Sequence, residues 1–266
     1  MNATPPDIPP PSQPVIAPIV EPSRTGAPPP DGWAVGANRG AAWWSEGWRL
    51  FTASPVIWIV ITLLYVALMI GLHLIPLVGQ IAGTLLTPVL AGGVLLGCRA
   101  LDRGGELTVG HLFAAFGTKL GPLALLGVLY FAGWVLALLI ALAIAAAAFG
   151  FGSLSALWSG DPMQMMAALG VGALVMALIV LLIAVPLVMA YWFAPALVTL
   201  RNDEPFGALK TSFVASLRNI PPFLAYGLLG IVFAIIATIP LGLGWLVLAP
   251  VFAASVYASY KDIFGD

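Results

Sequence analysis

Apolar residues fall into long, nearly uninterrupted stretches along this chain, separated by short breaks rich in glycine, proline or charge. A membrane-spanning helix needs about 20 mostly apolar residues, because the hydrocarbon core is about 30 Å thick and a helix rises about 1.5 Å per residue. Six stretches meet this requirement: Val56–Leu74, Leu77–Gly97, Leu120–Phe149, Ala167–Leu200, Pro221–Thr238 and Leu241–Tyr260. The pattern predicts an all-α integral membrane protein with six transmembrane helices.

Two of these stretches are longer than a bilayer requires. They are Leu120–Phe149 and Ala167–Leu200, and the second contains Pro186 and Pro195. Excess length in a spanning helix implies a tilt, a kink or an end that projects from the bilayer.

A short amphipathic stretch precedes each of the three successive pairs of spans. Their apolar residues recur at helical spacing: Trp44, Trp48 and Phe51 in the first stretch, Val109, Leu112, Phe113 and Phe116 in the second, and Phe206, Leu209, Phe213 and Leu217 in the third. Helices of this kind lie in the headgroup layer with the aromatic face towards the acyl chains. We expect them to be interfacial helices that anchor and orient the spans that follow.

The chain also contains an internal repeat. The run from Leu86 to Ala91 resembles the run from Leu248 to Ala253, and each is followed at the same distance by a basic residue. Upstream, the Ile-Pro-Leu sequence at 75–77 matches Ile-Pro-Leu at 239–241, with a weaker echo of the proline run at 194–197. The repeat predicts three helical hairpins that insert in the same direction, each preceded by an interfacial amphipathic helix.

Basic residues set the predicted orientation. They lie before the first span, between the second and third, between the fourth and fifth, and after the sixth: Arg24, Arg39, Arg49, Arg99, Arg103, Lys119, Arg201, Lys210, Arg218 and Lys261. The three other connections, near 71–79, 150–166 and 238–244, contain no lysine or arginine. Because basic loops stay in the cytoplasm, both termini are predicted to be cytoplasmic.

The composition agrees with a membrane protein. Hydrophobic residues make up 61% of the chain and charged residues 8%, and the mean hydropathy is +1.05. A soluble domain is about one quarter charged. The formal net charge of −1 gives no argument for a nucleic-acid partner. The single cysteine, Cys98, excludes an intrachain disulfide and a cysteine-based metal site.

Residues 1–38 differ from the rest of the chain. Proline recurs throughout them: Pro5, Pro6, Pro9, Pro10, Pro11, Pro14, Pro18, Pro22, Pro28, Pro29 and Pro30. Repeated proline removes backbone donors and favours extended geometry. We therefore expect 1–38 to be a disordered cytoplasmic tail and 39–266 to be the transmembrane domain. A partner that reads proline-rich segments is the alternative role for the tail.

Candidate catalytic, cofactor and metal residues are not evident in the sequence. Ionisable residues at depth in a membrane mark functional sites, but the only charged residue between Lys119 and Arg201 is Asp161, in a predicted outer loop. His73 and Gln80 flank the first outer turn and are best explained as an interfacial polar pair. His111 is too distant in sequence to complete a metal site, and Cys98 suits packing better than acylation. We predict no catalytic site, no cofactor and no metal.

Glycines are spaced for close helix contact in the second span. Gly79 and Gly83, and then Gly93 and Gly97, form two small-xxx-small pairs. Small residues let helix backbones approach each other in lipid. The spacing predicts tight packing of this span without identifying its partner.

The run Gly40-Ala-Ala-Trp-Trp-Ser-Glu-Gly-Trp-Arg-Leu-Phe51, with Pro55 and Trp58, resembles the opening of a family of uncharacterised proteobacterial inner-membrane proteins. The likeness covers about residues 40–264. More remotely, the run from Pro205 to Ser212, followed by Asn219-Ile-Pro-Pro, resembles the membrane domain attached to some glycerophosphodiester phosphodiesterases. Their soluble catalytic domain has no counterpart here, so the resemblance implies a fold and a bacterial inner-membrane location, without an activity.

These observations predict a non-enzymatic multi-pass protein with a structural, accessory or lipid-associated role. The lipid bilayer is its expected partner, and a second membrane protein or a second copy of the chain stays open. The alternative is a transporter or channel for a small or apolar solute, with carbonyls freed by Pro88, Pro195 or Pro250 lining its path.

Overall fold

The computed structural model describes residues 28–76, 78–149, 158 and 161–265. Within these ranges every regular element is a helix and no strand occurs, which confirms the all-α prediction. Five segments are long and apolar enough to cross a membrane: Pro55–His73, Val78–Asp102, Leu120–Ile144, Ala173–Arg201 and Ile220–Thr238. The sixth predicted span forms α11 (Trp245–Phe264), which carries charged and hydroxyl residues in its second half. The count of six therefore stays a prediction.

A proline separates the first two helices, α1 (Arg39–Ala53) and α2 (Pro55–His73). The residue before proline is driven out of the helical region, and Ser54 lies outside it, at φ −153° and ψ 61°. Proline itself suits the first turn of α2. The indole Nε1 of Trp58 then donates to the Leu50 carbonyl at 3.0 Å, which satisfies one of the carbonyls left open at the end of α1.

The second helix of the first hairpin is α3 (Val78–Asp102). It is followed by η1 (Val109–Phe113) and α4 (Ala114–Thr118), and both pack on α3. A Cβ on Gly93 would lie 2.4 Å from the His111 carbonyl oxygen, a distance that no side chain tolerates. The tight packing predicted from the glycine spacing is confirmed at Gly93, whose partner is η1, and at Gly97, but nothing lies within 4 Å of a Cβ on Gly83.

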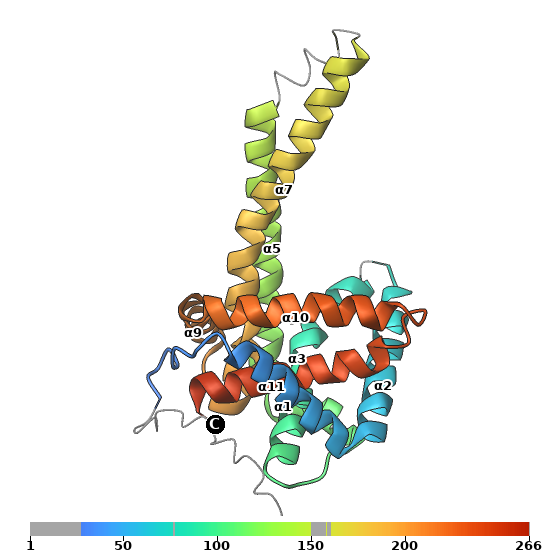
Figure 1. The fold of residues 1–266 in the computed structure, drawn as a ribbon, viewed down its shortest axis with the longest axis vertical. Helices are drawn as coiled ribbons and strands as arrows, with labels where there is room; N and C mark the ends of the chain where they lie inside the picture. The colour runs from blue at the N-terminus through green and yellow to red at the C-terminus, as the bar shows by residue number, and fades with distance from the viewer. Residues whose placement is uncertain (1–27, 77, 150–157, 159–160, 266) are drawn as a thin grey trace, which may run out of the picture.

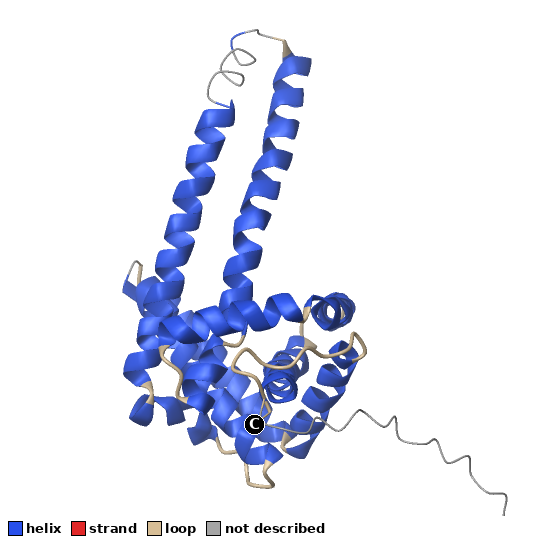
Figure 2. Ribbon diagram, turned by 90° about the vertical axis from the view of Figure 1, so that its left-hand side faces the viewer, coloured by secondary structure: helices blue, strands red, loops and turns tan. Residues whose placement is uncertain are grey.

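The longest helices, α5 (Leu120–Phe149) and α7 (Pro162–Trp192), run side by side and project far from the other helices, as Figures 1 and 2 show. They contain 30 and 31 residues. At about 1.5 Å per residue each is about 45 Å long, which exceeds the hydrocarbon core by about 15 Å. The excess length that the sequence predicts is therefore present, and it projects from the other helices of the protein.

The stretch predicted at Ala167–Leu200 breaks at Phe193, two residues before Pro195, and continues as α8 (Ala194–Ala196) and η2 (Leu197–Arg201). At the break, Ser212 of α9 (Pro205–Arg218) replaces a helical hydrogen bond. Its hydroxyl accepts from the Phe193 N–H at 2.9 Å and donates to the Met189 carbonyl at 2.7 Å. Insertion of a side chain into the backbone ladder is a recognised cause of a kink.

Two late helices, α10 (Ile220–Thr238) and α11, run roughly perpendicular to α5 and α7, as Figure 1 shows. This differs from the set of side-by-side spans that the sequence predicts. Close contact with α1 holds the two late helices, because a Cβ on Gly40 would lie 2.3 Å from the Pro222 carbonyl and one on Gly47 2.6 Å from the Val251 carbonyl. Glycine at both positions lets the backbones touch.

The sequence predicts that the aromatic face of α1 lies on lipid, but most of this face is covered by protein. Trp44 and Phe51 are buried, and the Trp44 ring stacks on Tyr226 of α10 with the ring centroids 4.7 Å apart. Trp48 is 53% exposed. Because helices α10 and α11 cover this face, α1 is largely a packed helix of the protein interior.

The third amphipathic helix, α9, follows the prediction more closely. Its small residues Ala208, Ser212 and Ala215 are buried, and the helix packs on α7. Phe206 is 74% exposed and Leu217 46% exposed, so part of the predicted apolar stripe stays available to an interface.

Residues 28–38, which the sequence assigns to the disordered tail, pack against the helical domain instead. The Trp33 N–H donates to the Ile263 carbonyl at 2.7 Å. The fully buried side chain of Asn219 accepts from the Val35 N–H at 2.8 Å and donates to the Trp33 carbonyl at 3.0 Å. A single buried amide therefore satisfies two backbone groups of this segment, and the predicted domain boundary at residue 38 stays a prediction. Residues 1–27 lie outside the described part of the chain.

Candidate functional site

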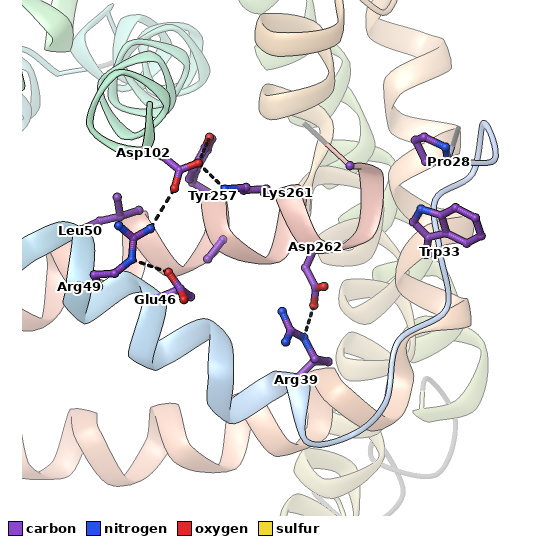
Figure 3. A pocket seen from close by; sticks show the side chains of 12 residues that line it. Pro28, Trp33, Arg39, Glu46, Arg49, Leu50, Asp102, Tyr257, Lys261 and Asp262 are labelled. Carbon is purple, nitrogen blue, oxygen red and sulfur yellow. Dashed lines mark hydrogen bonds and ion pairs between the residues drawn. The ribbon is translucent and has the colours of Figure 1, made fainter. Parts of the chain in front are cut away.

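A pocket of about 670 Å³, here called the charged pocket, opens where α1, α3 and α11 meet (Figure 3). Its ionisable lining residues come from all three helices: Arg39, Glu46, Arg49, Asp102, Lys261 and Asp262. Pro28 and Trp33 of the N-terminal segment complete one wall.

Asp102, the last residue of α3, lies at the centre of the charged pocket. Its Oδ1 accepts from Nη2 of Arg49 at 2.9 Å, and its Oδ2 accepts from Nζ of Lys261 at 2.5 Å. The Tyr257 hydroxyl also donates to Oδ2, at 3.2 Å. One carboxylate therefore joins α3 to both α1 and α11.

A second acid, Glu46, holds the other side of the Arg49 guanidinium. It lies one helical turn before Arg49, and the Nε–Oε2 distance is 2.7 Å. The hydrogen bond to Glu46 is the main cause that raises the pKa of Arg49 above its usual value, against the opposing effect of burial, and Asp102 adds to it. Arg49 therefore stays charged at neutral pH.

A separate ion pair closes the N-terminal end of α1 against the C-terminal end of α11. Nε of Arg39 lies 2.7 Å from Oδ2 of Asp262, and the Trp43 indole donates to the same oxygen at 2.9 Å.

Two acids of the charged pocket are less exposed than two of its bases. The side chains of Asp102 and Asp262 are 9% exposed, whereas those of Arg49 and Lys261 are 55% and 44% exposed. The half-buried carboxylates of Asp102 and Asp262 therefore act as supports, and Arg49 and Lys261 face the opening. The two carboxylates hold the cations in place, since Asp102 accepts hydrogen bonds from Arg49 and Lys261 and Asp262 accepts one from Arg39.

A second hollow, here called the apolar groove, has a volume of about 700 Å³ and lies between α1, α10 and α11. Its walls include Trp44 and Trp48 of α1, Leu229 and Phe233 of α10, and Leu248 of α11. No charged residue lines it. The groove and the charged pocket lie on different sides of α1. The groove takes positions 41, 44, 45 and 48 and the pocket positions 39, 46, 49 and 50, which fall on different faces of a helix with about 3.6 residues per turn.

The polar residues singled out from the sequence lie elsewhere. His73 is exposed at the end of α2, where its Nδ1 lies 2.7 Å from the carbonyl oxygen of Met69, and Gln80 is exposed near the start of α3. His111 caps η1, since its Nδ1 accepts from the Thr108 N–H at 3.0 Å. Cys98 is fully buried in α3, where an acyl donor has no access.

In the described ranges, no group of three or more histidine, cysteine, aspartate or glutamate residues is placed so that it could hold a metal ion.

Sequence reasoning missed the charged pocket because it treated Arg49 and Lys261 only as topology markers. One signal was available at Asp102. An acidic residue at the C-terminal end of a helix is unfavourable next to the negative end of the helix dipole. Its presence there indicates a compensating cation, although not which one.

The chain is 29% identical over 235 residues to a probable inner membrane protein of Burkholderia thailandensis. The alignment covers 84% of this chain and 82% of that protein. The likeness points to the inner membrane. Together with the apolar helices it supports a multi-pass inner-membrane protein. No family model matches the chain, and no solved structure matches it.

Proposed function

We propose that this protein is a non-enzymatic, lipid-associated component of the inner membrane, and that the apolar groove holds one acyl chain of a membrane lipid. The observation that carries this proposal is the groove itself: about 700 Å³ of space whose lining residues include no charge. Small-molecule sites have volumes of about 300–1,000 Å³ and mostly apolar walls.

The surroundings of the groove favour a lipid as its occupant. Large apolar side chains near it on α10 are open, with Leu228 66%, Ile235 61% and Ile236 56% exposed. In a membrane these side chains contact acyl chains. A lipid tail therefore reaches the groove from the bilayer without crossing water.

The transporter reading receives less support. It requires carbonyls freed near a proline such as Pro88 to line a path. Pro88 is buried, and its Cγ lies 3.2 Å from the position of a Cβ on Gly127 of α5. The ring fills the contact between α3 and α5, which favours packing as the role of this proline.

The finer topology is also part of the proposal: six spans, three hairpins, and both termini in the cytoplasm. A recurring contact supports the repeat. The segment before a hairpin packs on the second helix of a hairpin in each case: α9 on α7, η1 and α4 on α3, and α1 on α11. The cyclic order of these contacts is the one that three equivalent units would produce.

The groove is tested by filling it. Ser45 lines the groove and is exposed on α1, so Ser45→Trp places an indole there without altering a buried contact. The full chain is purified in mild detergent with a lipid that carries a photoreactive diazirine in its acyl chain, and cross-linked peptides are mapped by mass spectrometry. We expect cross-links at Trp44, Trp48 or Phe233 in the natural chain and their loss in Ser45→Trp.

Thr52→Trp is the matched control, because Thr52 is exposed on the same helix but does not line the groove. It should retain the cross-links. Equal labelling of Ser45→Trp and Thr52→Trp would contradict the acyl-chain proposal. Catalytic turnover by the purified chain would contradict the non-enzymatic part separately.

A further inference from the structure

The charged pocket holds two cations on one carboxylate. Arg49 and Lys261 each bind a different oxygen of Asp102, at 2.9 and 2.5 Å. Because both cations lie within hydrogen-bond distance of the same carboxylate group, their charges are neighbours. Like charges this close repel each other. Asp102 balances one of the two cations, and the second is balanced by Glu46, whose side chain is 47% exposed and can be displaced from Arg49 by an incoming anion.

Donors remain on both cations after these contacts. Arg49 uses Nε for Glu46 and Nη2 for Asp102, and its Nη1 group carries two more N–H donors. Lys261 uses one of its three N–H donors for Asp102. These side chains are 55% and 44% exposed, so the remaining donors are accessible from the opening of the charged pocket.

We propose that the charged pocket is a phosphate-binding site, which takes either the phosphate of a lipid headgroup or a free phosphate ester. Arginine and lysine that converge on one point form strong, charge-assisted hydrogen bonds to phosphate oxygens. Asp102 positions the two cations from below, with its side chain 9% exposed. The pocket volume of about 670 Å³ accommodates a headgroup.

Glu46 determines what the charged pocket selects. Its carboxylate is 47% exposed and lies 2.7 Å from Nε of Arg49. An incoming phosphate competes with Glu46 for the same guanidinium, whereas a ligand that also carried an ammonium group would gain an ion pair with Glu46. Neutralising Glu46 therefore strengthens binding of a plain phosphate and weakens binding of a zwitterion.

This inference does not rest on the acyl chain in the apolar groove, since the two hollows lie on different sides of α1. An empty groove would leave the phosphate site intact, and an unoccupied phosphate site would leave the groove intact.

Calorimetric titration of the full chain in detergent, stripped of lipid, tests the site with two probes: inorganic phosphate and the soluble short-chain lipid dihexanoyl phosphatidic acid. We expect Lys261→Gln to weaken binding about tenfold, in line with the loss of one charge-assisted hydrogen bond. We expect Glu46→Gln to tighten binding about threefold by removing the competing carboxylate. Lys210→Gln, an exposed residue of α9 outside the charged pocket, should bind like the natural chain.

The gain in Glu46→Gln cannot come from misfolding, so it keeps the test decisive even if Lys261→Gln is unstable. Tighter binding of inorganic phosphate than of the short-chain lipid would identify a free phosphate as the natural ligand. Binding of the lipid alone would identify a headgroup. No binding of either probe at 10 mM or so, or weaker binding in Glu46→Gln, would overturn the proposal.

Discussion

Nζ of Lys261 lies 2.5 Å from Oδ2 of Asp102, a contact that links the final helix of the chain to the end of α3 across 159 positions of sequence. Arg49 binds the other oxygen of the same carboxylate. Helices from the beginning, the first hairpin and the end of the chain therefore share one buried acid. This contact makes the charged pocket a structural junction as well as a candidate binding site.

Replacing this acid should weaken the junction. Asp102→Asn removes the charge that holds two cations and turns an N–H donor towards one of them. We expect a loss of about 1–2 kcal/mol in the free energy of unfolding, below the value of about 3–5 for fully buried pairs, because Arg49 and Lys261 are half-exposed. Thermal unfolding in detergent measures the loss. Glu106→Gln, at an exposed acid outside the pocket, should leave the midpoint unchanged, and an equal effect of both substitutions would refute the role of Asp102.

The positions of most helices could be predicted from the sequence, because uninterrupted apolar runs have only one way to satisfy their backbone in lipid. The bounds predicted for α5, Leu120–Phe149, coincide with the helix. The charged pocket could not be predicted in the same way. Its residues belong to three helices whose contacts depend on how the hairpins pack, and apolar helices without strong periodicity do not indicate which faces meet.

The face of α1 illustrates the same limit. An aromatic stripe such as Trp44, Trp48 and Phe51 is compatible with contact to lipid or to another helix. Glycines 40 and 47, which share one face at a spacing of seven residues, decide between these readings because they permit backbone contact with α10 and α11. Reading the glycines together with the aromatic residues would have predicted a packed helix.

Gly47→Ala tests this contact. The added Cβ would lie 2.6 Å from the Val251 carbonyl oxygen and 2.9 Å from the Ser255 nitrogen, and backbone atoms cannot move aside as a flexible side chain can. We expect destabilisation of about 1–3 kcal/mol, as for overpacked cores, seen as a lower thermal midpoint. Gly227→Ala is the matched control, since nothing lies within 4 Å of its added Cβ. Alanine there should be neutral or stabilising by up to about 1 kcal/mol, and the same sign of effect at both glycines would argue against close α1 packing.

Asn219→Leu should release the N-terminal segment. Its side chain is fully buried and holds Val35, Trp33 and the Ala215 carbonyl through hydrogen bonds of 2.8, 3.0 and 2.8 Å. Leucine leaves those backbone groups without a partner, at a cost of about 1–3 kcal/mol. Chymotrypsin should then cleave after Trp33 several-fold faster, as followed by mass spectrometry. The exposed Asn38→Leu is the control, and unchanged cleavage in Asn219→Leu would show that other contacts hold the segment.

The last prediction concerns the orientation of the chain in the membrane. Reporter fusions after Gly79, Ser159 and Gly242 should be active outside the cytoplasm, and fusions after Arg103 and Asp203 inside it, because basic residues gather only at the second set of positions. The fusion after Gly242 tests whether α10 (Ile220–Thr238) crosses the bilayer, because it follows α10 and precedes α11. A cytoplasmic signal there would mean that α10 does not cross the bilayer and that α11 does not return across it. The chain would then have four spans. The repeat would hold for the contacts between helices but not for the way the hairpins insert into the membrane.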